Sequence, residues 1–172
     1  MVQIRRATRA DREVVYAFHR ALYVEHRQQV LEPSLQLLYA YRDFDALLGS
    51  DVDSLLQGAR SSVWLAEESD QVLGYVTGRI EFERERVLPC RGVVEDWYVL
   101  QSARGRGVGR LLLEHLLQFF ADSGCDLAES STLPANAPAR RLHEALGFRE
   151  TEIKYRRLLE PRRRSDDRSE AK

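Results

Sequence analysis

Residues 94–113, VEDWYVLQSARGRGVGRLLL, contain the strongest structural signal in the chain. The first six residues include the aromatic and β-branched types that strands favour. Three glycines then alternate with arginines, and a run of leucines begins directly after them. Apolar residues from position 108 to 121 recur at helical spacing. This order predicts a strand, a glycine loop and an amphipathic helix.

The glycine loop, RGRGVGR at residues 104–110, suits an anion. A helix N-terminus presents unpaired N–H groups and the positive end of its dipole, and glycines let a phosphate approach the backbone. We expect a phosphate or pyrophosphate here, with charge added by Arg104, Arg106 and Arg110; the alternative is a simple turn with solvated arginines. The loop is not a P-loop, because Leu111 stands where Ser or Thr is needed. It is not a Rossmann fingerprint either, because its spacing is G-x-G-x-G.

The rest of the chain predicts a mixed α/β fold in a single domain over residues 1–160. Strands are expected at residues 2–6, 62–66, 72–82, 92–100, 126–131 and 152–159. Helices are expected after the caps at 8–11 and 136, over 108–121, and once or twice within 31–58. The strand–helix–strand order in the second half demands a parallel pair joined by a right-handed crossover. The charged tail, residues 161–172, is expected to be disordered.

Composition excludes several classes of protein. The 172 residues are 44% apolar, enough for one core, and carry a net charge of −1. We therefore expect neither nucleic acid nor membrane as a partner. Cys90 and Cys125 form no C-x-x-C pair, which argues against a zinc site or disulfide scaffold and suits a reducing compartment. No signal peptide or membrane-spanning run is recognisable, so a cytoplasmic location is expected.

Two motifs in the right order resemble the GNAT superfamily of N-acetyltransferases. Arg104-x-x-Gly107-x-Gly109 is similar to the family's pyrophosphate signature, and NAPARRLHEALGF (residues 136–148) resembles its Asn-x-x-Ala-x-x-Leu-Tyr-x-x-x-Gly-Phe segment. The opening, IRRATRADREVV, is similar to the family's first strand and helix. The resemblance implies a mostly antiparallel sheet with a central parallel pair that splays apart, flanked by helices.

The resemblance also implies a reaction, the direct transfer of acetyl from acetyl-CoA to a primary amine, without a metal. The strand ending at Val99 would offer a backbone N–H to the thioester carbonyl, since such donors are commonly the largest contribution in acyl transfer. The residues implied to bind acetyl-CoA are Trp97, Tyr98, Val99, Arg104, Gly105, Arg106, Gly107, Val108, Gly109, Arg110 and Asn136. Plain β-core for Trp97 and Val99, and helix capping alone for Asn136, are the structural alternatives.

Two carboxylates, Glu95 and Asp96, lie within an otherwise apolar strand, on opposite faces by the two-residue period. An unpaired buried charge is expensive, so one of them is expected to face a wet acceptor channel. There Glu95 would take the amine proton as the catalytic base or anchor the amine, and Asp96 would bind substrate. The alternative is a structural ion pair with an arginine such as Arg91. The segment is similar to that of diamine acetyltransferases, which favours a cationic acceptor.

His143 stands where the family usually has the tyrosine that donates a proton to the departing thiolate. Histidine can also donate a proton, but it is shorter, and the alternative is a histidine on the helix surface without a catalytic role. The sequence therefore predicts an acetyl-CoA-dependent N-acetyltransferase acting on a diamine, polyamine, protein lysine or N-terminus. A non-catalytic acyl-CoA sensor is the alternative, and a homodimer is expected from the family.

Overall fold

A computed structural model describes residues 1–158, within which five strands form one sheet in the order β1-β2-β3-β4-β5. The strands are β1 (Gln3–Arg6), β2 (Ser61–Glu68), β3 (Gln71–Phe82), β4 (Cys90–Val99) and β5 (Leu127–Ser130). Neighbours run antiparallel except β4 and β5, which are parallel. The predicted mixed sheet with one parallel pair is confirmed.

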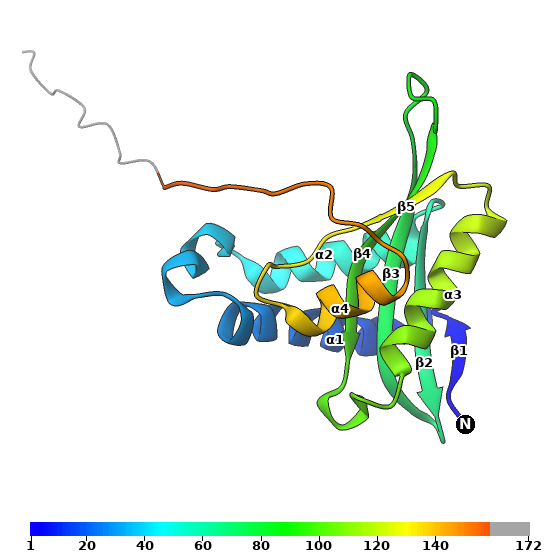
Figure 1. The fold of residues 1–172 in the computed structure, drawn as a ribbon. Coiled ribbons are helices and arrows are strands. Elements are labelled where there is room, and N and C mark those ends of the chain that lie inside the picture. The colour runs from blue at the N-terminus through cyan, green and yellow to red at the C-terminus, as the bar shows by residue number, and fades with distance from the viewer. Residues whose placement is uncertain (159–172) are drawn as a thin grey trace, which may run out of the picture.

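Helices cover both faces of the sheet (Figure 1). They are α1 (Arg12–Glu25), α2 (Phe44–Gln57), α3 (Val108–Asp122) and α4 (Ala137–Ala145). One core cluster packs α1 and α2 against the sheet, and Tyr75 lies fully buried in it. A second cluster packs α3 against the opposite face, and Leu146 and Phe148 attach the end of α4 to it. The sheet therefore separates an α1/α2 side from an α3/α4 side.

Local sequence signals account for several boundaries. The β2–β3 hairpin turns through Ser69 and Asp70, whose φ angles are +50° and +64°. Gly124 and Gly147 follow α3 and α4 with φ angles of +79° and +85°, the left-handed conformation that commonly ends helices. The Asn136 side chain accepts a hydrogen bond from the Ala139 N–H at 3.3 Å, which confirms the predicted cap of α4.

The parallel pair between β4 and β5 is short. Arg91–Val94 of β4 pair with Leu127–Ser130 of β5, and the register ends there. The following five residues of β4 keep β3 as a neighbour but have no β5 partner. The sheet therefore opens into a wedge after Val94, as the resemblance implies.

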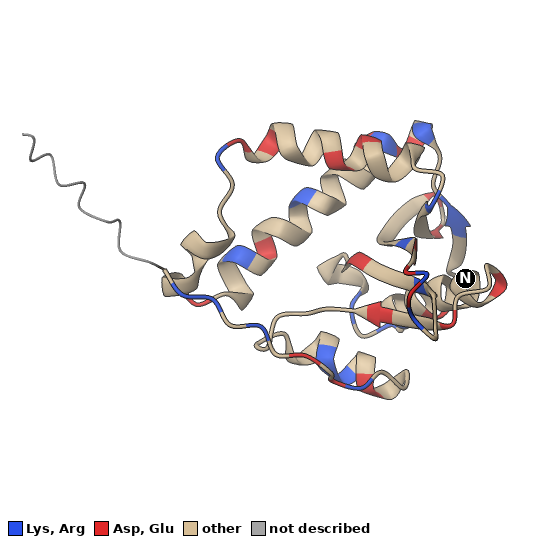
Figure 2. Cartoon of the chain, turned by 90° about the horizontal axis from the view of Figure 1, so that it is seen from above, with Lys and Arg blue, Asp and Glu red and all other residues tan. Residues whose placement is uncertain are grey.

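Charges of both signs are interspersed along α1, whereas the charged residues of α2 are all acidic (Figure 2), namely Asp45, Asp51 and Asp53. In the described part of the chain, no helix combines the length and the apolar character that a bilayer span would need.

The strand predicted at 152–159 is wrong for the residues that the structure describes. Residues 151–158 have no regular secondary structure and are exposed. Ile153 and Tyr155 alternate with polar residues, yet both face solvent because the segment pairs with no strand. Its Arg156 instead donates to the Leu38 carbonyl at 3.0 Å, in the connection between α1 and α2. The tail predicted to be disordered, 161–172, lies outside the described residues.

Candidate active site

The glycine loop before α3 presents free backbone N–H groups. Gly105 and Gly107 have φ angles of +76° and +80°, and beyond their chain neighbours no described residue has an atom within 4 Å of the point where either would carry a Cβ. Gly107 is the N-cap of α3, and its carbonyl accepts the Leu111 N–H at 3.0 Å. The N–H groups of residues 108–110 consequently lack partners within the helix. The loop is open and fits an anion such as a pyrophosphate.

Gly109 lets the start of α3 approach β4. A Cβ on Gly109 would lie 2.9 Å from Cζ2 of Trp97, too close for a side chain. The Trp97 Nε1–H is buried beside this first turn and has no hydrogen-bond partner among the described residues. The Val108 side chain is 1% exposed, so this residue offers a ligand only its backbone.

The three loop arginines are each paired with a carboxylate of the protein. The pairs are Arg104 with Glu25, Arg106 with Glu68 and Arg110 with Glu114. The Arg104 Nε–H also donates to the Val99 carbonyl at 3.0 Å. Exposed pairs of this kind contribute about 0–1 kcal/mol each, so a phosphate could displace the acids at low cost. The backbone N–H groups remain the donors that are free without any rearrangement.

The wedge also exposes backbone donors of β4. The N–H groups of Asp96 and Leu100 point toward β3, the latter donating to a β3 carbonyl at 2.9 Å. Because strand N–H groups alternate in direction, those of Trp97 and Val99 point into the wedge. These N–H groups are about 6.6 Å apart, so a carbonyl lying between β4 and β5 can accept from one of the two, and not from Tyr98.

The side chains of the three predicted lining residues lie on two faces. Trp97 and Val99 pack toward the α3 core. Tyr98 lies on the other side, where its ring centroid is 5.9 Å from that of Phe18 in α1. Trp97 and Val99 thus belong to the wedge, and Tyr98 to the α1/α2 side.

A β-bulge brings the two carboxylates of β4 together. Glu95 and Asp96 both stand opposite Thr77 of β3, where the register shifts. Both side chains line one cavity of about 300 Å³ on the α1/α2 side. The predicted placement on opposite faces is wrong, because the bulge interrupts the two-residue alternation.

Glu95 is ion-paired with Arg79 of β3. Arg79 also donates to Glu81 at 2.6 Å. Arg91, the arginine considered from the sequence, pairs instead with Glu81 and Glu129. Glu95 thus forms an ion pair of the kind considered from the sequence, with Arg79 in place of Arg91 as the partner.

Of these two carboxylates, Asp96 is the one that has no arginine partner among the described residues. The Thr77 hydroxyl donates to it at 3.5 Å, and Nδ1 of His19 is also 3.5 Å away. Burial raises the pKa of Asp96 above its usual value. His19 itself lies 2.9 Å from the hydroxyl of Tyr75, whose pKa burial also raises. A raised pKa makes the Asp96 carboxylate a better proton acceptor than an ordinary aspartate.

His19 is a site residue that sequence reasoning missed. It is 4% exposed and lies on the apolar face of α1 between Val15 and Leu22. A histidine on that face was the available signal. The cavity brings residues of α1, α2, β2, β3 and β4 together, namely His19, Asp51, Ser54, Leu55, Ser61, Arg79, Glu95 and Asp96.

His143 is half-buried on the α3/α4 side rather than free on the helix surface. Its Nδ1 lies 2.8 Å from the Ala139 carbonyl and its Nε2 lies 2.7 Å from Oγ of Ser130. The ring packs edge-on to Trp97 at 6.0 Å. The structure thus places His143 next to the wedge, on the side opposite the two carboxylates.

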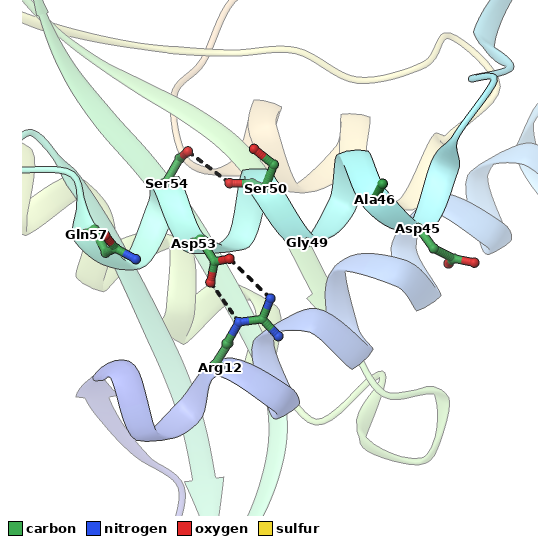
Figure 3. A pocket seen from close by; sticks show the side chains of 8 residues that line it. All are labelled: Arg12, Asp45, Ala46, Gly49, Ser50, Asp53, Ser54 and Gln57. Atoms are coloured by element: carbon green, nitrogen blue, oxygen red, sulfur yellow. Dashed lines mark hydrogen bonds and ion pairs between the residues drawn. The ribbon is translucent and has the colours of Figure 1, made fainter.

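A larger groove of about 530 Å³ runs along α2 (Figure 3). Arg12 spans it and donates to both oxygens of Asp53, at 2.7 and 3.2 Å. The groove shares only Ser54 with the smaller cavity and contains no predicted site residue. Its size alone does not make it the site.

Comparison with known proteins identifies the family. The acetyltransferase (GNAT) family model matches residues 14–148. An aminoglycoside N(6′)-acetyltransferase type 1 from Stenotrophomonas maltophilia is 32% identical over 111 residues, covering 62% of this chain and 72% of that protein. A protein of the same name from Salmonella typhimurium is 30% identical over 112 residues, covering 63% and 77%. The solved structure of the aminoglycoside N-acetyltransferase AAC(6′)-Iy in complex with CoA superposes with a TM-score of 0.70 at 24% identity, covering 92% of this chain and 96% of that one.

The chain belongs to the GNAT family of acetyltransferases. The predicted fold and enzyme class, an acetyl-CoA-dependent N-acetyltransferase, are confirmed.

Proposed function

We propose that this enzyme acetylates a primary amine of a small polycationic compound, and that aminoglycosides are its acceptor class. The observation that supports this most directly is the cavity at the β4 bulge, lined by Asp51, Glu95 and Asp96. Arg79 offsets one of these three negative charges. The remaining excess of acid favours an acceptor with more than one ammonium group.

The relatives' names supply independent support for the acceptor class. The two relatives above are named as aminoglycoside N(6′)-acetyltransferases, and the matches to them span most of those proteins. Of the acceptors predicted from the sequence, a polyamine shares the same cationic chemistry. A protein lysine presents a single ammonium group and would leave part of the acidic lining without a partner.

In the proposed mechanism the acceptor amine enters from the α1/α2 side and attacks the thioester in the wedge. Asp96 accepts the amine proton, and Asp51, which lines the same cavity from α2, anchors a second ammonium group. The N–H group of Trp97 polarises the acetyl carbonyl, and that of Val99 is left to bond the pantetheine arm. This moves the role of base, assigned to Glu95 from the sequence, to Asp96, because the ion pair occupies Glu95 and leaves Asp96 available.

The acidic cavity also favours an enzyme over an acyl-CoA sensor. A protein that only binds acyl-CoA needs the loop and the wedge, whereas it has no use for carboxylates on the far side of β4. Buried or half-buried carboxylates cost folding free energy, which a catalytic role explains.

A thiol-release assay with paired acceptors tests the proposal. A 6′-amino aminoglycoside and its 6′-hydroxy counterpart differ at one group, and spermidine and a lysine peptide represent the other classes. We expect turnover with the 6′-amino compound, slower turnover with spermidine, and none with the 6′-hydroxy compound. Turnover of the peptide alone would overturn the acceptor class, and equal turnover of both aminoglycosides would exclude the 6′ position. The predicted homodimer is tested separately by light scattering.

A further inference from the structure

Ser130 lies at the point where the sheet opens. It is the last residue of β5 and pairs with Val94, after which β4 and β5 part. Ala128, two residues earlier, packs into the α3 core, so Ser130 faces the same side of the sheet. This is the side from which α4 presents His143. A hydroxyl and an imidazole therefore meet at the closed end of the wedge.

The hydrogen bonds of His143 define how its protons are arranged. The Ala139 carbonyl can only accept, so the Nδ1 atom 2.8 Å from it carries a hydrogen and donates. Nε2 is then the atom that exchanges a proton with Oγ of Ser130, 2.7 Å away. Trp97 and Phe148 hold the ring edge-on, at centroid distances of 6.0 and 5.2 Å. The last turn of a helix, where His143 lies in α4, attracts positive charge.

The length of the wedge places the coenzyme sulfur near Ser130. Five residue steps of β4 separate Val94 at the closed end from Val99 next to the glycine loop. At 3.3 Å per step they span roughly 16 Å. The extended pantetheine arm has a comparable length between its phosphate and its sulfur. With the pyrophosphate on the loop, the thioester lies in the inner half of the wedge, with its carbonyl at the Trp97 N–H and its sulfur toward the closed end, where Ser130 and His143 meet.

We propose that Ser130 is the group that protonates the departing coenzyme thiolate, with His143 as the proton source behind it. As the amine nitrogen bonds to the acetyl carbon and the carbon–sulfur bond breaks, the Ser130 hydroxyl proton passes to sulfur. The Nε2 proton of the His143 imidazolium passes to Ser130, and solvent restores the imidazolium. Histidine is shorter than the tyrosine that the family usually has at this position, and the Ser130 hydroxyl bridges the remaining distance to sulfur. The assignment rests on the proposed acetyl transfer.

Ser130→Ala tests this role, with its exposed neighbour Ser131→Ala as the matched control. We expect Ser130→Ala to lower kcat with acetyl-CoA by about 10–100-fold, the mild end of general acid catalysis, since a thiolate is a fair leaving group. Its affinity for CoA should not change, and Ser130→Thr should retain most of the rate. The selenoester analogue of acetyl-CoA releases a selenolate that needs no proton at neutral pH, so with it Ser130→Ala should match the wild type. An equal defect with both donors, or no defect, would overturn the assignment.

A second measurement does not depend on any acceptor. Ultraviolet absorbance of the thiolate follows the titration of CoA bound to each variant. A hydroxyl that donates to sulfur stabilises the thiolate, so the bound thiol should titrate at higher pH in Ser130→Ala than in the wild type or Ser131→Ala. Identical titrations would overturn the assignment. If Ser130→Ala and the wild type differ in this titration but the wild type acetylates no amine, the result would instead count against the proposed function.

Discussion

Gly107 offers the sharpest test of the loop, because the chain contains a matched control at the other end of the same helix. Gly107 precedes α3 with φ +80°, and Gly124 follows it with φ +79°. Beyond the chain neighbours, no described residue has an atom within 4 Å of a Cβ placed at either position. Alanine in the left-handed region costs about 1–2 kcal/mol. The variants Gly107→Ala and Gly124→Ala should therefore lose the same stability, roughly 2–8 °C in Tm for a chain of this size.

The two variants should differ in acetyl-CoA binding. A methyl group on Gly107 projects into the space beside the free N–H groups of α3 and holds the pyrophosphate away from them. Losing one charge-assisted hydrogen bond costs about 1.5–3 kcal/mol. We therefore expect Gly107→Ala to raise the Kd for acetyl-CoA by about 10–150-fold, whereas Gly124→Ala should leave it unchanged.

Calorimetric titration of acetyl-CoA into each variant measures the affinity directly. Thermal shift at saturating ligand gives an independent reading, because a ligand at 100 times its Kd stabilises the folded state by about 2.7 kcal/mol. Equal affinities in Gly107→Ala and Gly124→Ala, with both proteins folded, would reduce the loop to a strand-to-helix turn. Equal losses in both would mean that strain, and not contact with the phosphate, governs binding.

Three further outcomes follow from the titratable groups. Asp96→Asn should lower kcat/KM by about 10²–10⁴ near neutral pH, and a pH–rate profile should show the defect shrinking toward the amine's own pKa. The Arg5 guanidinium lowers the pKa of Asp11 to about 2, so this pair stabilises the fold above about pH 4 and the benefit is lost as pH falls toward 2; acid denaturation of Asp11→Asn should lack that part of the curve. Burial raises the pKa of Cys125 to about 12. Although its sulfur lies 3.4 Å from that of Cys90, oxidation of the pair to a disulfide by diamide, followed by mass spectrometry, should therefore be slow at pH 7 and accelerate with pH. Fast oxidation at pH 7 would contradict the raised pKa.

The features that the sequence predicted are those whose causes lie within a few residues. Asn136 is followed by the N–H that it caps, and Gly107 and Gly124 mark the two ends of α3 through their own backbone angles. The parallel pair followed from the order of strands and the handedness of crossovers. The cap and the helix ends have signal and structure in one short segment, whereas the parallel pair depends only on the order of the strands along the chain.

The features that the sequence did not predict depend on partners distant in the chain. The bulge at Glu95 and Asp96 is a property of the register between β3 and β4, and neither strand shows it alone. Arg79 reaches Glu95 from that neighbouring strand. The strand predicted at residues 152–159 was wrong, in its described part, for the opposite reason. The alternation of apolar and polar residues suits a strand, but no described strand lies beside residues 152–158 to form the hydrogen bonds that would stabilise it.

The bulge and the wedge together explain how one strand can serve both halves of the reaction. Acetyl transfer requires a base for the incoming amine and an acid for the departing thiolate, and the two must stay apart so that they do not neutralise each other. Along β4 the bulge turns Asp96 toward the α1/α2 side, while the loss of β5 opens the opposite side toward Ser130 and His143. The thioester would lie in the plane of the sheet between them, against the free N–H group of Trp97. A proton then leaves the amine on one face and another reaches sulfur on the other.

Under this arrangement the double variant Asp96→Asn with Ser130→Ala should show the product of the two single defects when measured with acetyl-CoA, because the two groups share no contact. A double variant no slower than Asp96→Asn alone would mean that the two groups act in one proton path, and the separation by the sheet would have to be abandoned.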